Sequence, residues 1–147
     1  MKILSRRSNN INIATFWENF NLGKYEFSPI YQREGDVWNE MEKSYLIDTI
    51  LKNFPMPPIF LHQHIDNDTG KTLYDIVDGK QRLSAIISFL KNEISVPEDF
   101  ANDGFGEPKL EGLYFKDFDN PEVSEWKKML WQYEITIEYV ETDEATV

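Results

Sequence analysis

Apolar residues recur at helical spacing in four parts of the chain. Such spacing places them on one face of a helix, which is typical of helices that pack against a core. The four faces are Ile13, Phe16, Trp17 and Phe20; Leu46, Ile47, Ile50, Leu51 and Phe54; Leu83, Ile86, Ile87 and Leu90; and Trp126, Met129, Leu130 and Tyr133. The pattern therefore predicts four amphipathic helices.

Polar residues and prolines mark where two of these helices begin and one ends. Asn39 is followed three residues later by Glu42, which predicts a capping box at a helix start. Pro55 cannot continue that helix and is expected to end it. Asn120-Pro121 supplies a cap and a first-turn proline for the last helix.

Strand-like patterns lie between the helical segments. The predicted strands are residues 25–27, 59–65, 72–77, 93–96 and 135–139, the last alternating apolar Ile135, Ile137 and Tyr139 with polar neighbours. Residues 66–70 are rich in Asp, Asn and Gly and predict a hairpin turn, and residues 97–108 predict a loop. This order of elements predicts a mixed α/β fold.

Composition bounds the class of protein. With 147 residues and 41% hydrophobic residues, we expect a single domain over residues 1–147 that buries its own core. The absence of cysteine excludes disulfides, thiolate zinc sites and a cysteine nucleophile. No signal peptide or membrane span is visible, so a cytoplasmic protein is expected.

The net charge of −11 is unevenly distributed. Residues 1–91 contain 11 Lys/Arg and 11 Asp/Glu, whereas residues 92–147 contain 4 and 15. The acidic excess therefore lies in the C-terminal part, where a solvated surface is the simplest interpretation. Taken whole, the charge argues against a chain that coats duplex DNA by neutralising its phosphates.

The most informative motif is Asp78-Gly79-Lys80-Gln81-Arg82, between a predicted strand and a predicted helix. The first turn of a helix has backbone N–H groups without intrahelical partners, and it carries the positive end of the helix dipole. Gly79 permits a tight turn and close approach of a ligand, while Lys80 and Arg82 add positive charge. The motif thus favours phosphate binding, although its spacing matches neither a Walker A loop nor a dinucleotide fingerprint.

The same residues also allow a purely structural interpretation. In that alternative Asp78 caps the helix, Gly79 is only a turn residue, and Lys80 and Arg82 are solvated. Asp75 and Asp78 are three residues apart on a strand, which predicts side chains on opposite faces. Asp78 alone is therefore the better candidate, either as a residue that binds Mg²⁺ through water or as one that orients Arg33 or Arg82.

Several motifs, taken in order, resemble the N-terminal domain of GmrSD-type restriction proteins, the DGQQR-motif family of the ParB/sulfiredoxin-like superfamily. They are Tyr31-Gln32-Arg33, Val37-Trp38, residues 46–51, residues 57–61 and residues 76–85. The family's usual first glutamine is Lys80 here. Sulfiredoxin chemistry is excluded, because Gln81 stands where a sulfiredoxin has its cysteine.

The resemblance implies a ParB-like mixed sheet flanked by helices. It also implies a nucleotide-binding, NTP-hydrolysing domain of an anti-phage restriction system, with an HNH-type nuclease domain supplied in cis or in trans. Asp78 and Gln81 would orient water, and Gly79, Lys80, Arg82, Gln32 and Arg33 would contact the nucleotide, with Mg²⁺ at Asp78. In the family a further helix follows the last strand, so the chain is expected to be an N-terminal fragment, truncated at its C-terminus.

Two other candidates have competing interpretations. Arg33 follows Pro29 and could instead pair with Glu34 or Asp36 for structural reasons. His62 and His64 project from one face of a strand, but without a third ligand at a converging spacing they do not predict a metal site.

The alternative function is a non-catalytic ParB-like module that binds DNA or a protein. In that case the same turn would hold a DNA phosphate without hydrolysis. Few phosphate contacts are available, so DNA binding by this chain alone is expected to be weak.

Overall fold

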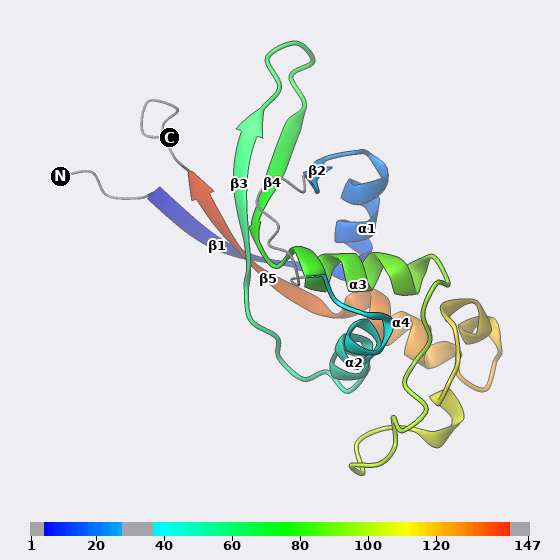
Figure 1. The fold of residues 1–147 in the computed structure, drawn as a ribbon. Helices are drawn as coiled ribbons and strands as arrows, with labels where there is room; N and C mark the ends of the chain where they lie inside the picture. Colours follow the sequence, from blue (N-terminus) through cyan, green and yellow to red (C-terminus); the bar gives the residue numbers. More distant parts are fainter. Residues whose placement is uncertain (1–4, 28–36, 142–147) are drawn as a thin grey trace. The chain divides into compact units, whose positions relative to one another are not determined.

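The computed structural model describes residues 5–27 and 37–141 (Figure 1). The chain forms two compact units. The sheet unit consists of residues 1–31, 57–80 and 134–147, and the helical unit of residues 32–56 and 81–133. The prediction of one domain over the whole chain stays a prediction.

The sheet unit contains one five-stranded mixed sheet and one helix. Its elements are β1 (Ser5–Asn12), α1 (Ile13–Asn21), β2 (Tyr25–Glu26), β3 (Ile59–Ile65), β4 (Thr72–Asp78) and β5 (Glu134–Glu141). The strand order is β1-β5-β3-β4-β2, with β3 antiparallel to β4 and parallel to β5. The predicted hairpin and the mixed α/β class are confirmed.

Strand β1 has no counterpart in the sequence predictions. Its residues are almost all polar, and Arg6 to Asn10 are exposed at the edge of the sheet. The strand is held by antiparallel pairing with β5, visible in Figure 1 as the blue and red strands side by side. Arg7 adds a hydrogen bond from Nη2 to Gln63 Oε1 at 2.6 Å and lies over the Tyr139 ring.

The core of this unit lies on one face of the sheet, and α1 contributes residues to that core. The Asn12 side chain accepts a hydrogen bond from the Thr15 N–H and so caps α1. The ring of Phe16 lies 5.0 Å from the ring of Tyr25. The buried residues of the unit are Ile13, Phe16, Tyr25, Ile59, Leu61, Ile135, Ile137 and Tyr139.

The helical unit contains α2 (Glu40–Leu51), most of α3 (Lys80–Leu90), the short 3₁₀ helices η2 (Pro108–Leu110) and η3 (Phe115–Asp119), and α4 (Ser124–Gln132). The capping box is confirmed, because Asn39 and Glu42 exchange hydrogen bonds between side chain and backbone. The predicted apolar faces of α2 and α3 are buried, with Ile47 and Ile86 almost fully covered. Phe54 is the exception, because it is half-buried and lies beyond Leu51, where α2 ends ahead of Pro55.

Two expectations for this unit are wrong. Residues 93–96 form no strand. Val96 instead exchanges backbone hydrogen bonds with Leu113 and Gly112, and its side chain is buried without extended strand pairing. Helix α4 begins at Ser124 and not at Pro121, because the Asn120 side chain accepts from the Glu122 N–H in a separate turn.

Met129 also departs from its predicted place. It is 45% exposed, whereas Leu130 of the same predicted face is buried. The apolar face of α4 is therefore narrower than its sequence pattern indicates.

Candidate functional site

Strand β4 ends at Asp78 and helix α3 begins at Lys80, so Gly79 is the one residue between them. Gly79 has a φ of 106°, a conformation that residues with a Cβ rarely adopt. Glycine therefore allows the chain to pass from strand to helix in a single step. The predicted order of strand, glycine turn and helix is confirmed.

The pairing of β4 with β3 is irregular just before this turn. Ile76 pairs with Leu61, but the next pair joins Asp78 to Phe60, so Val77 is an extra residue and is 62% exposed. Directly paired residues share a face of the sheet, and Phe60 is two residues from His62, the partner of Asp75. The bulge thus places Asp78 on the face that carries Asp75, contrary to the expectation of opposite faces.

The first turn of α3 is basic. It contains Lys80 and Arg82 and no acidic residue. Its backbone N–H groups lie at the positive end of an 11-residue helix, where an anion is stabilised. Asp78 is exposed, and Lys80 and Arg82 are half-buried.

Gln81 has a partner that the sequence did not indicate. Its Oε1 accepts a hydrogen bond from the backbone N–H of Trp38 at 3.2 Å. Both residues are half-buried and belong to the helical unit. This contact joins the motif to the segment that leads into α2, across 43 residues of sequence.

Two predicted contact residues, Gln32 and Arg33, lie outside the described residues. The roles of Gln32 and Arg33 stay predictions.

The family model of the GmrSD restriction endonuclease N-terminal domain matches residues 13–145, most of the chain. The chain belongs to this family. Searches of curated proteins and of solved structures found no match. The expected family is confirmed, and with it a place in a DNA restriction system.

No helix within the described ranges of this GmrSD N-terminal domain is long and apolar enough to cross a membrane. Within the same ranges, no group of three or more His, Asp or Glu side chains is arranged to hold a metal ion. The nucleotide, the Mg²⁺ ion at Asp78 and the HNH-type nuclease partner stay predictions.

Asp75 connects the two histidines of this GmrSD domain. Its carboxylate oxygens lie 3.4 Å from His62 Nδ1 and 3.3 Å from His64 Nε2, and the two imidazole rings stack 5.7 Å apart. The sequence alone indicates no acid at a spacing that converges with these histidines. The strand register supplies one, because it places Asp75 directly opposite His62.

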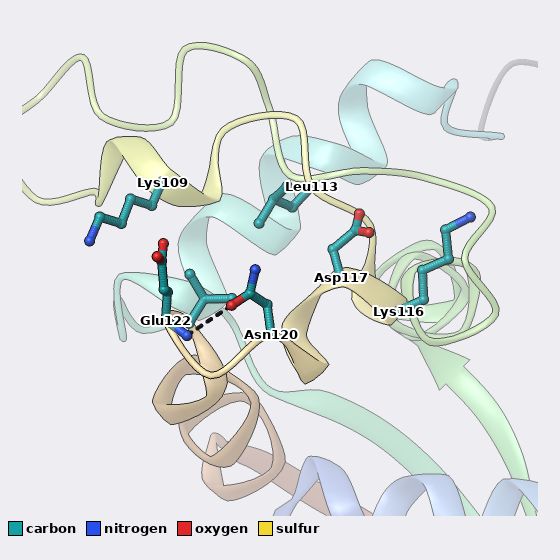
Figure 2. Close-up of a pocket in the computed structure, with 7 residues that line it drawn as sticks. Lys109, Leu113, Lys116, Asp117, Asn120 and Glu122 are labelled. Carbon is teal, nitrogen blue, oxygen red and sulfur yellow. Dashed lines mark hydrogen bonds between the residues drawn. The ribbon is translucent and has the colours of Figure 1, made fainter.

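A cavity of about 520 Å³ lies elsewhere in the helical unit (Figure 2). Lys109, Leu113, Lys116, Asp117, Asn120, Glu122 and Val123 line it, and none of these is a predicted site residue. Figure 2 shows the hydrogen bond from the Glu122 N–H to Asn120, which closes the turn ahead of α4. The cavity mixes amines with carboxylates and contains no pairing that indicates a reaction.

Proposed function

We propose that this GmrSD N-terminal domain binds a nucleoside triphosphate at the start of α3 and hydrolyses it as part of a restriction system. The observation that carries the proposal is the turn at Gly79, which leads directly from β4 into the basic first turn of α3. Glycine geometry, a helix N-terminus and two cationic side chains all favour the same ligand, a phosphate group.

Each residue of the turn has a role in this proposal. Backbone N–H groups after Gly79 donate to phosphoryl oxygens, Lys80 contributes a point charge, and Arg82 contributes a fork that binds two oxygens. These donors stabilise the charge that develops on the phosphoryl group as the terminal bond breaks. Gln32 and Arg33 are proposed as a second set of nucleotide contacts.

Asp78 suits Mg²⁺, because it is an exposed carboxylate at the edge of the phosphate turn. When bound, the ion would neutralise phosphate charge. Asp78 or Gln81 orients the water that attacks the terminal phosphoryl group, so that nucleoside diphosphate and inorganic phosphate are released. DNA cleavage is assigned to an HNH-type nuclease domain in cis or in trans.

Calorimetric titration tests the binding step. ATP with Mg²⁺ is expected to bind more tightly than adenosine, since the turn supplies phosphate contacts. Arg82→Ala should remove most of this difference, whereas the matched control Arg6→Ala, at an exposed position on β1, should retain it. Equal affinities for ATP and adenosine would contradict a phosphate site, and an assay of phosphate release from ATP tests hydrolysis.

A parallel titration with duplex DNA separates this function from the ParB-like binding module. With a net charge of −11, the domain should bind unmodified DNA weakly and with a shallow salt dependence. A submicromolar complex at physiological salt whose affinity falls steeply as salt rises would favour the module.

A further inference from the structure

The Gln81 amide is oriented by its contact with Trp38. A backbone N–H only donates, so the atom of Gln81 that lies 3.2 Å from it must be the carbonyl oxygen, Oε1. This contact uses Oε1, so Nε2 is the part of the Gln81 amide that can donate to a ligand. Whatever ligand approaches Nε2 must offer acceptor atoms.

We propose that Gln81 binds the phosphate and bridges it to the start of α2. Its Nε2 donates to a phosphoryl oxygen, and its Oε1 holds the Trp38 N–H. This inference rests on the proposed function, and it replaces the water-orienting role of Gln81 with that of a hydrogen-bond donor. Water orientation then falls to Asp78.

The bridge ends at a well-defined helix start. Trp38 directly precedes Asn39, the first residue of the capping box of α2. A phosphate that immobilises Gln81 therefore also immobilises the backbone at the entry to α2. Nucleotide binding is thus communicated to a segment distant in sequence through one side chain.

A second polar contact also joins α2 to α3. Lys43 Nζ in α2 donates to Ser88 Oγ in α3 at 3.3 Å, and Ser88 is buried. Apolar residues on both helices, such as Ile47 and Leu83, are buried as well. Substitutions at half-buried Gln81 should therefore leave the helical unit folded, which thermal melting of each variant verifies.

Amide hydrogen exchange and ATP·Mg²⁺ titration of the same samples test the bridge. Gln81→Ala removes both the acceptor and the donor, so it should accelerate exchange at the Trp38 amide and weaken ATP binding by about tenfold. Gln81→Glu retains an acceptor for Trp38 but presents a negative charge to phosphate. It should therefore keep the Trp38 amide protected while weakening ATP binding at least as much. Gln132→Glu, the same change in α4, is the matched control and should alter neither measurement.

The outcomes separate the donor role of Gln81 Nε2 from the acceptor role of Oε1. Full ATP affinity in Gln81→Glu would overturn the donor role, and unchanged Trp38 exchange in Gln81→Ala would overturn the acceptor role. If the unsubstituted domain binds no ATP, the proposed function fails and the ligand half of the bridge fails with it. The contact between Gln81 and Trp38 is then still judged by exchange in the free protein.

Discussion

Lys52 Nζ lies 2.8 Å from Oδ2 of Asp103, and the lysine side chain is only 2% exposed. Asp48 is a second partner at 2.9 Å, and the ammonium group also lies over the Phe100 ring. Burial acts to lower the pKa of Lys52, but the hydrogen bonds to Asp103 and Asp48 outweigh it, so the pKa is raised. One covered cation thus connects the end of α2 to the 97–108 loop.

Replacing Lys52 should therefore destabilise the helical unit. Lys52→Met keeps an apolar stem but leaves Asp48 and Asp103 without their cation, and we expect a loss of about 1–3 kcal/mol in the free energy of unfolding. Lys127→Met is the matched control, since its partner Asp119 is 71% exposed, and it should change stability by less than about 1 kcal/mol. Urea denaturation measures both. Equal effects of the two substitutions would show that the covered position of Lys52 adds nothing to the free energy of unfolding.

Gly106 is expected to be intolerant of any side chain. A Cβ at this position would lie 2.2 Å from the backbone oxygen of Phe100, and a backbone atom cannot move aside as a side chain can. Gly106→Ala should cost about 3 kcal/mol or more. Gly104→Ala, in the same loop, has open space but a φ of 82°, and it should cost only about 1 kcal/mol. Thermal denaturation of the two variants measures this difference. If Gly104→Ala were more destabilising than Gly106→Ala, the packing of this loop would be contradicted.

Tyr25 should make stability fall at alkaline pH. Burial raises its pKa from 10.0 to about 12, opposed by a hydrogen bond from Asn19. The folded protein disfavours the phenolate form of Tyr25. The stability associated with the protonated phenol is therefore fully present below pH 10, and it is lost as the pH rises towards about 12. Tyr25→Phe should therefore lose less stability than the unsubstituted protein across that interval, by up to about 2 kcal/mol.

Denaturation at a series of pH values measures this difference. Tyr114→Phe removes an exposed phenol and serves as the control. If the two variants follow the same pH profile, the burial of Tyr25 does not govern alkaline stability.

The parts of the fold that the sequence predicts correctly are those with local causes. The capping box of Asn39 and Glu42 depends on residues within a four-residue segment. The turn at Gly79 likewise depends on a glycine between a strand pattern and a helix pattern. In each case the residues that determine the structure are neighbours along the chain.

The features that sequence reasoning missed depend on partners distant in the sequence. Strand β1 is polar and becomes a strand only through pairing with β5, about 130 residues away, so its own pattern carries no signal. Two contacts have the same kind of cause. The hydrogen bond between Gln81 and Trp38 requires tertiary packing. The position of Asp75 opposite His62 requires the strand register. The bulge at Val77 shifts that register by one residue, which is why alternation misplaced Asp78.

Arg82 provides the sharpest test of the phosphate site, because its charge and its geometry can be changed separately. It lies in the first turn of α3 beside buried Leu83, and its own side chain is only half-buried. Arg82→Ala should remove most nucleotide binding, a loss of about tenfold or more, while the melting temperature changes little. Arg82→Lys keeps the charge but loses the planar fork, so it should restore only part of the affinity.

Circular dichroism melting and nucleotide titration on the same samples measure the two effects. Full rescue by lysine would mean that the site needs only a positive charge at this position, and bidentate binding would be wrong. A sharp fall in the melting temperature of Arg82→Ala would instead identify Arg82 as a structural residue. The phosphate would then have to be held by the remaining donors, Lys80 and the backbone N–H groups that follow Gly79, and the Lys80→Ala variant would become the decisive measurement.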